Sequence, residues 1–341
     1  MKFPRYLDSL ASSFMPLLAF VLSGIGVVSA QSNQPAGKGG YLFVTFKGES
    51  TPMTEQIYFG LSQDGLHWDA LNNSNPVLIS DVGEKGVRDA YLLRAHDGKT
   101  FFIIATDLDI NLNKNWTRAT HAGSKSIVVW ESDDLVEWSA PWLVKVADDD
   151  AGCTWAPEAI YDEQTSDYLV YWASTTGRDN FAKQRIWSAH TTDFKTFSQP
   201  EIYIDKADTV YDTDIVRDGN VYYRFSKEPA KKAITMETAS KLAGPWLEIP
   251  SPSLAAATQR YEGPAAFQFT PQGQGQPETW CLMLDNGGYK AFTTTDLASG
   301  KFTASNETKF PFPFRHGSVL PLSAEEYQRV KFAYASAGMR K

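Results

Sequence analysis

The sequence has little cysteine and no cluster of basic residues. Only two of its 341 residues are cysteines, Cys153 and Cys281, which excludes a disulfide framework and leaves either one disulfide or two buried thiols. Lys and Arg number 32 against 40 Asp and Glu, a formal charge of −8. Without a Lys/Arg run to neutralise phosphates, nucleic acid is a poor candidate for a partner.

The first thirty residues differ in composition from the rest. Lys2 and Arg5 give a basic start, residues 14–28 are largely apolar, and Val28-Ser29-Ala30 offers small residues for cleavage. This order is typical of a secretory signal peptide. A membrane anchor is the alternative, but about 15 apolar residues are short for a bilayer that needs roughly 20. We therefore expect a secreted, extracellular protein with no membrane contact after residues 1–30 are removed.

One sequence unit recurs five times along the chain. Each unit has a strand of alternating hydrophobicity that ends in Ser or Thr, then a polar turn, then an aromatic residue. The five aromatic residues stand 70, 59, 49 and 56 residues apart: Trp68, Trp138, Phe197, Trp246 and Phe302. These spacings match a four-stranded propeller blade with its loops. The repeat predicts an all-β fold, a five-bladed β-propeller.

Four of the units begin with an additional strand, whereas the N-terminal unit lacks one. The segment Phe314–Leu322 has the form of these first strands and no unit of its own. We expect it to supply the innermost strand of the first blade and so close the ring. Residues 31–341 then form a single propeller domain.

The five first strands share a column of residues that can titrate or bind a metal: Asp89, Glu158, Asp212, Glu262 and His316. Because the inner strands of a propeller surround one channel, we expect these side chains to converge at one face. Buried charges are costly without a purpose. The set therefore favours acid/base chemistry on a small polar substrate, or metal binding. The alternative is that each side chain caps a strand end or lies at a solvated turn.

Five segments together resemble glycoside hydrolase family 43, the five-bladed propellers that include arabinofuranosidases, arabinanases and xylosidases. The resemblance covers roughly residues 40–331 and rests on Gly86–Ala90, Thr154–Tyr161, Asp212–Val216 with Gly219–Tyr223, Tyr261–Pro264 and Arg315–Val319. It implies that Asp89 is the catalytic base, Asp212 the residue that raises the pKa of the acid, and Glu262 the general acid. Ala90 stands where the family commonly has Pro, and Asp214 competes with Asp212 for its role.

The resemblance further implies a secreted hydrolase that removes terminal α-L-arabinofuranosyl residues from arabinan or arabinoxylan. Inversion by single displacement is expected if the two carboxyls stand about 6.5–9.5 Å apart, and a covalent intermediate if they are near 5 Å. A β-D-xylosidase or an endo-arabinanase of the same family is an alternative. From another class, a non-catalytic sugar-binding propeller is the rival.

Four further residues are candidates for the site. Trp155 and Glu158 are expected to bind substrate, although Trp155 could instead pack within a blade. Arg224 could contact a sugar hydroxyl or pair with a carboxylate. No cofactor is required, but the resemblance implies a possible calcium ion held by His316, with a neutral, hydrogen-bonded His316 as the alternative.

Overall fold

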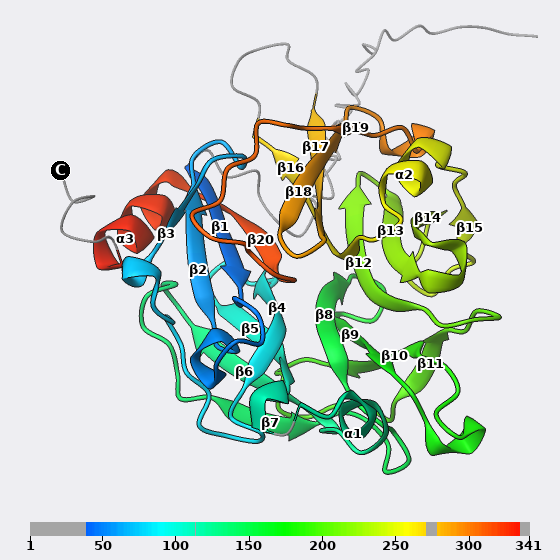
Figure 1. The fold of residues 1–341 in the computed structure, drawn as a ribbon. Helices are drawn as coiled ribbons and strands as arrows, with labels where there is room; N and C mark the ends of the chain where they lie inside the picture. Colours follow the sequence, from blue (N-terminus) through cyan, green and yellow to red (C-terminus); the bar gives the residue numbers. More distant parts are fainter. Residues whose placement is uncertain (1–38, 113, 271–277, 335–341) are drawn as a thin grey trace, which may run out of the picture. The chain divides into compact units, whose positions relative to one another are not determined.

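The computed structural model describes residues 39–112, 114–270 and 278–334, and it arranges them as five four-stranded antiparallel sheets (Figure 1). The predicted leader, residues 1–30, lies outside the described residues. Within the described part, no helix is long and apolar enough to cross a membrane.

The sheets follow one another along the chain, except that the last strand joins the first sheet. The first blade contains β1 (Gly40–Thr45), β2 (Tyr58–Ser62), β3 (Trp68–Ala70) and β20 (Ser318–Leu322). The second contains β4 (Val87–Arg94), β5 (Phe101–Asp107), β6 (Ser126–Ser132) and β7 (Trp142–Lys145), and the third β8 (Trp155–Asp162), β9 (Asp167–Ser174), β10 (Arg185–Thr191) and β11 (Glu201–Ile204). The fourth contains β12 (Tyr211–Asp218), β13 (Val221–Glu228), β14 (Ala233–Ala239) and β15 (Leu247–Glu248), and the fifth β16 (Glu262–Phe269), β17 (Thr279–Asp285), β18 (Tyr289–Thr294) and β19 (Thr303–Ala304).

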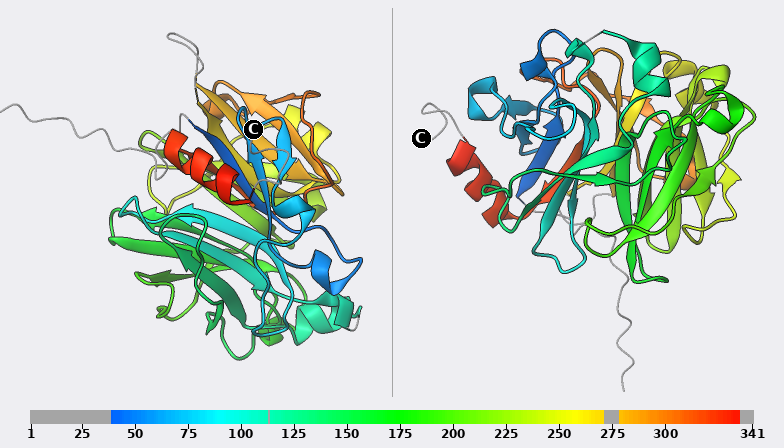
Figure 2. Two further views of the ribbon diagram at one scale, coloured as in Figure 1. Left: turned by 90° about the vertical axis from the view of Figure 1, so that its left-hand side faces the viewer. Right: turned by 90° about the horizontal axis from the view of Figure 1, so that it is seen from below.

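Short helices occupy some of the connections. The α-helices are α1 (Trp116–His121), α2 (Pro252–Ala257) and α3 (Ala324–Tyr334). The 3-10 helices are η1 (Pro52–Thr54), η2 (Asn72–Ser74), η3 (Ile110–Leu112), η4 (Gly177–Asp179), η5 (Pro229–Lys231) and η6 (Leu297–Ser299). Helix α3 lies against β1 and β20 of the first blade (Figure 2) and buries Tyr327 and Val330.

The first strands of the blades form a closed ring. Strand β4 contacts β8, β8 contacts β12, β12 contacts β16, β16 contacts β20, and β20 contacts β4 again. Strand β20 pairs with β1 in antiparallel register, from Gly40 opposite Leu322 to Val44 opposite Ser318. The five-bladed propeller and its closure by the C-terminal strand are therefore confirmed.

Apolar side chains fill the spaces between neighbouring blades. Ile103 and Ile104 are adjacent on β5 and point to opposite faces of the sheet, as the period of two in a strand requires. Ile103 packs with Leu42 and Trp130 in one core, and Ile104 packs with Val170 in the next. Cutting either isoleucine back to alanine would cost about 2–5 kcal/mol. These cores hold the blades rigidly around the channel.

Both cysteines are free thiols and are fully buried, Cys281 in the core of the fifth blade and Cys153 in the connection before β8. Burial raises the pKa of Cys153 to about 11, so its thiol is unreactive near neutral pH. Of the two alternatives left open by the sequence, the structure has the buried thiols.

Candidate active site

Four of the five inner strands carry a bulge near the start of the strand. The pairing register skips after Arg88 on β4, Trp155 on β8, Tyr211 on β12 and Glu262 on β16. The residue that follows each of these has a left-handed backbone: φ is 49° at Asp89, 47° at Ala156, 48° at Asp212 and 56° at Gly263. A bulge changes the direction of its side chains, and such strain in non-glycine residues, roughly 1–2 kcal/mol each, is often kept at functional sites.

The bulges show that the residues predicted to share one column are not all structurally equivalent. The structurally equivalent residues are Asp89, Ala156, Asp212 and Gly263, so Glu158 lies two residues further along its strand than Asp89 does. Glu262 lies one residue before its bulge. The prediction that all five residues share one layer was wrong, because an alignment by residue type does not show where each acid lies relative to the bulge of its strand.

Glycine is required at position 263 because a Cβ there would lie 2.7 Å from Cγ of His316. Its φ of 56° costs glycine little, whereas Asp89, Ala156 and Asp212 adopt a similar conformation under strain. Gly263 thus allows the imidazole of His316 to approach the strand that carries Glu262.

A pocket at the starts of the inner strands brings together Asp89, Asp212, Glu262, Trp155 and His316, all of which the sequence had suggested. The other residues that line it are Phe46, Arg88, Leu108, Trp116, Gln184, Tyr211, Asp285 and Arg315. The three carboxyls come from three different blades, β4, β12 and β16. The propeller therefore assembles the pocket from residues that are far apart in the sequence.

Asp212 is the most strongly perturbed acid in the pocket. Its Oδ2 accepts a hydrogen bond from the backbone N–H of Gly263 at 3.0 Å and lies 3.6 Å from Nδ1 of His316. Burial raises the pKa of Asp212 to about 7, and the charges of Glu262 and Asp89 act in the same direction, against His316 and the Gly263 N–H. Asp212 therefore exchanges its proton near neutral pH.

Asp89 is oriented from the neighbouring strand of its own blade. The hydroxyl of Thr106 on β5 donates to Asp89 Oδ2 at 3.1 Å and accepts from the backbone N–H of Ala156 at 2.8 Å. The other oxygen, Oδ1, lies 3.5 Å from Nδ1 of His316. Asp89 and Asp212 thus approach the same imidazole nitrogen.

Glu262 is held by a tyrosine from the preceding blade. The Tyr211 hydroxyl donates to Glu262 Oε2 at 3.3 Å. Burial raises the pKa of Tyr211, and the charges of Asp212 and Glu262 raise it further, so the phenol stays protonated and acts as a donor. Glu262 is only half-buried, which leaves its carboxyl accessible from the pocket.

His316 is placed as a partner of carboxylates. Burial disfavours the imidazolium, but Asp212, Asp89, Asp285 and Glu262 together raise the pKa of His316 above its usual value. In the described ranges no three His, Cys, Asp or Glu side chains are grouped so as to hold a metal ion. A calcium ion at His316 stays a prediction, and the contacts of His316 in the structure are with the carboxylates of Asp89 and Asp212.

Two tryptophans and an arginine line the outer part of the pocket. The rings of Trp116 and Trp155 meet edge to face with their centroids 6.1 Å apart, and Trp116 is 48% exposed. The Arg88 guanidinium lies 5.3 Å from the Trp116 ring centre and pairs with Glu49 at 2.7 Å and Glu55 at 3.0 Å. The exposed indole is thus held in place by charged neighbours.

Three pocket residues, Trp116, Arg88 and Tyr211, were not predicted from the sequence. Trp116 begins α1, in a connection without a readable motif. Arg88 and Tyr211 could have been found, because each comes directly before an aspartate of the predicted base and modulator positions. In a bulged strand, the residue before the left-handed position points toward the same pocket as Glu262 does.

Arg224 does not line the pocket. Its Nε donates to Glu237 Oε2 at 2.8 Å, and its guanidinium stacks 4.2 Å from the ring centre of Trp246. Both charged side chains are at most 8% exposed. The prediction that Arg224 binds substrate is corrected: of the two roles considered, it pairs with a carboxylate inside the fourth blade.

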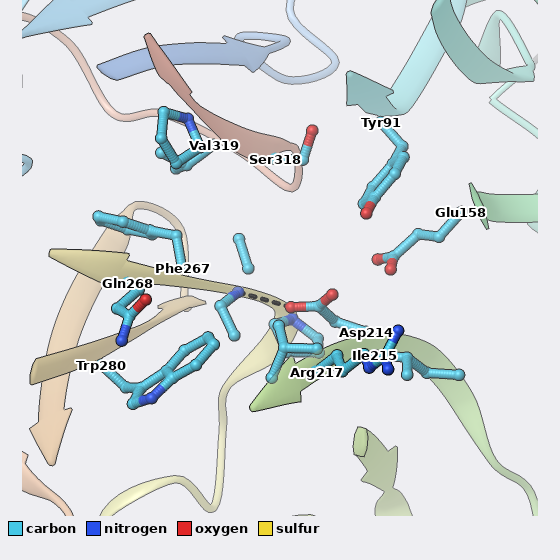
Figure 3. Close-up of a pocket in the computed structure, with 15 residues that line it drawn as sticks. Tyr91, Glu158, Asp214, Ile215, Arg217, Phe267, Gln268, Trp280, Ser318 and Val319 are labelled. Atoms are coloured by element: carbon cyan, nitrogen blue, oxygen red, sulfur yellow. Dashed lines mark hydrogen bonds between the residues drawn. The ribbon is translucent and has the colours of Figure 1, made fainter. Parts of the chain in front are cut away.

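Glu158 also lies outside the pocket. It lines a second cavity further along the inner strands, together with Tyr91, Asp214 and Ser318 (Figure 3). Its side chain is 4% exposed, and Oε2 accepts a hydrogen bond from the Tyr171 hydroxyl at 3.0 Å. The expectation that Glu158 touches substrate is therefore corrected. The same placement removes Asp214 as a rival for the role of Asp212.

Comparison with known proteins gives a match over nearly all of the described chain. Residues 38–328 match the family related to glycoside hydrolase family 43 that is described as "Probable glycosyl hydrolase domain". An α-L-arabinofuranosidase of Bifidobacterium longum is 27% identical over 89% of this chain and 32% of its own length. The chain thus spans about a third of the length of this curated relative.

Solved structures show the same fold at low identity. An α-L-arabinanase of Penicillium chrysogenum in complex with arabinobiose has a TM-score of 0.52 at 15% identity and covers 83% of both chains. An endo-1,4-β-xylanase of Bacteroides thetaiotaomicron has a TM-score of 0.52 at 14% identity, over 86% of this chain and 98% of its own. At such identities the likeness concerns the propeller and not the substrate.

Proposed function

This chain belongs to glycoside hydrolase family 43, and we propose that it removes terminal α-L-arabinofuranosyl residues from arabinan or arabinoxylan by a single displacement with inversion. The observation that carries the proposal is the pocket that gathers Asp89, Asp212 and Glu262 from three blades. The arabinofuranosidase relative supports the choice of sugar.

In the proposed reaction, Asp89 acts as the base and Glu262 as the acid. Glu262 gives its proton to the glycosidic oxygen as the bond to the anomeric carbon breaks. A water on the opposite side of the sugar attacks that carbon and gives a proton to Asp89. The sugar leaves with inverted configuration, and the two carboxyls return to their starting states by exchanging protons with solvent.

The contacts of the two carboxyls suit these roles. Thr106 donates to one oxygen of Asp89, which fixes the carboxylate while the other oxygen stays toward the pocket. Tyr211 donates to Glu262, and the half-buried position of Glu262 leaves it open to a leaving group. Fixed groups of this kind lower the entropy cost of reaching the reactive geometry.

Asp212 supports the acid by electrostatic repulsion. The charges of Asp212 and Glu262 act on one another, and two carboxylates in one buried site cannot both ionise readily. We propose that this mutual repulsion is how Asp212 tunes the acid, because the charge of Glu262 in turn raises the pKa of Asp212. His316, between Asp89 and Asp212, limits the total negative charge of the pocket.

The tryptophans at the rim are proposed as sugar platforms. Trp155 stays a candidate for stacking on the sugar, and Trp116 is the more exposed of the two. The apolar face of a sugar ring packs on an indole, while its hydroxyls face Arg88 and Gln184. The rim, and not the three carboxyls, would then distinguish an arabinofuranoside from a xyloside.

The experiment that tests the proposal is a substrate screen. We expect cleavage of 4-nitrophenyl α-L-arabinofuranoside and release of arabinose from branched arabinan, with the anomer released first, read by proton NMR, opposite to that of the substrate. The D89N variant is the matched control and should lose turnover with both substrates. Cleavage of the β-D-xyloside alone, or only of internal arabinan bonds, would overturn the choice of substrate. Binding of arabinose without any turnover would overturn the enzymatic proposal.

Secretion is a separate part of the proposal. If residues 1–30 are a signal peptide, the full chain expressed in a secreting host should appear in the medium with a new N-terminus near Gln31. N-terminal sequencing of the released protein tests this. A full-length chain retained in the membrane fraction would contradict it.

A further inference from the structure

Two buried acids lie close together deeper in the channel, and the proposed reaction does not use them. Asp214 comes two residues after Asp212 on β12, and Glu158 faces it from β8 (Figure 3). The side chains are 3% and 4% exposed, and their carboxyls face each other across the cavity that both residues line. We call Glu158 and Asp214 the acid pair.

Neighbouring groups hold the acid pair in a fixed arrangement. The Tyr171 hydroxyl donates to Glu158 Oε2 at 3.0 Å, and the backbone N–H of Ala266 donates to Asp214 Oδ2 at 2.5 Å. The Tyr91 side chain points toward both carboxyls from β4 in Figure 3. Each acid thus has its own donor, and two buried carboxyls that face each other cannot both ionise readily.

No described basic side chain neutralises the acid pair directly. Arg217 is the one Arg or Lys that lines the same cavity, and its Nη1 pairs with Glu163 at 2.8 Å. The titratable groups whose charges act on the pair, or on which the pair acts, are Tyr91 on β4, Tyr171 on β9, Asp212 on β12, Tyr289 on β18 and His316. Burial raises the pKa of each of these tyrosines, so they remain neutral phenols.

We propose that Glu158 and Asp214 share one proton and act as positioning residues, whose single negative charge lies beneath Asp212 and His316 and favours the protonated forms of both. Two buried carboxyls in contact cannot both ionise, so holding one proton between them is the favourable state. Only the effect on turnover rests on the function proposed above.

The pKa values of the two acids agree with this assignment. Burial and then the charge of Asp214 raise the pKa of Glu158 well above its usual value, so Glu158 keeps the proton. Burial raises the pKa of Asp214 to about 6, although the Ala266 N–H and the hydrogen bond from Glu158 lower it. As the pH rises through about 6, the pair therefore gains one negative charge and keeps one proton.

Two isosteric variants separate charge from shape. In D214N, the amide oxygen can still accept from Ala266 and the amide nitrogen can donate to Glu158, but the pair loses its charge. In E158Q, the amide can accept from Tyr171 and donate to Asp214, and the charge on Asp214 remains. A purely structural role predicts similar effects of the two variants, whereas the proposal predicts different ones.

The experiment is a proton NMR titration of the histidines in the full chain. The sequence has five histidines, and the H316N variant identifies the signal of His316. We expect D214N to move the titration midpoint of His316 down by about one pH unit, because the negative charge that Asp214 loses acts on the imidazole. E158Q keeps that charge and should leave the midpoint within a few tenths of a pH unit. Equal shifts in the two variants, or no shift in D214N, would overturn the proposal.

Two further measurements keep the test independent of folding and of substrate. The infrared difference spectrum of wild type minus E158Q at pH 7 should show the loss of one protonated-carboxyl band beyond the bands of Asp212 and Glu262 that both proteins keep, and the absence of such a loss would refute the shared proton. Once a substrate that the protein cleaves is known, kcat/KM can be measured as a function of pH. The fall of kcat/KM at alkaline pH should move to lower pH in D214N and stay in place in E158Q. A His316 shift without any turnover would support the acid pair and reject the glycosidase.

Discussion

Replacing Asp212 by asparagine should stabilise the fold while it destroys activity. Folding raises the pKa of this carboxyl from 3.8 to about 7, and burial is the main cause. A raised pKa in the folded state means that the contribution of the group to stability is fully present below pH 3.8 and is lost as the pH rises through 7. The charged Asp212 is therefore a cost to the protein above pH 7, and D212N removes it.

The magnitude follows from the same pKa. A change of roughly three pH units corresponds to about 4 kcal/mol of unfolding free energy. The variant also loses the attraction between Asp212 and His316, whose atoms are 3.6 Å apart, while asparagine can still accept from the Gly263 N–H. We expect a net gain of about 2 kcal/mol at pH 8, which raises the melting temperature of a domain of this size by roughly 3 °C.

The assay is thermal unfolding of wild type and D212N from pH 3.5 to pH 8, together with kcat/KM at each pH. The difference in melting temperature should vanish near pH 3.5 and be largest above pH 7. The exposed Asp133, changed to Asn, is the matched control and should show no pH-dependent difference. A D212N variant less stable than the wild type at pH 8, or a difference independent of pH, would refute the reasoning.

Four other predictions concern the general acid Glu262, the rim residue Trp116, the buried Arg224 and the possible metal ion. E262Q should abolish cleavage of arabinan but spare much of the activity on 4-nitrophenyl arabinofuranoside, whose leaving group needs little protonation; equal loss on both would remove Glu262 from the acid role. W116A should raise KM for oligosaccharides several-fold with kcat nearly unchanged, and a W116F variant should recover most of the loss. R224Q should lower stability by about 3 kcal/mol, because Glu237 is left buried with Lys206 as its remaining partner, yet leave KM unchanged per folded molecule. Dialysis against EDTA should leave melting temperature and activity unchanged, and a loss restored by calcium would show a site that His316 and its carboxylates do not suggest.

The architecture could be predicted from the sequence because the repeat has a physical cause. A propeller blade buries its faces against neighbouring blades, so each unit needs the same alternation and the same turn. Phe314–Leu322 could be assigned to the first blade because each of the other four units already contained a first strand, and only the N-terminal unit lacked one. The structure confirms this pairing in the register of β1 with β20.

The depth of each residue in the channel could not be predicted in the same way. The sequence pattern does not mark the bulge, so Glu158 and Asp89 looked equivalent although Glu158 lies two residues beyond Ala156, the residue equivalent to Asp89. The Ala156-Pro157 and Gly263-Pro264 pairs mark two of the bulges, and an Asp occupies the others. The position of Trp116 depends on how the loop before β6 folds back, which follows from tertiary packing and not from local preference.

The pairing of β20 with β1 makes the pocket depend on a late stage of protein synthesis. While the ribosome is still adding residues after β19, four blades can form, but the first lacks its inner strand and His316 is missing. Asp89 and Asp212 then lack the imidazole that lies between them. The complete pocket, with His316 between the two carboxyls, therefore forms only after β20 has left the ribosome and paired with β1.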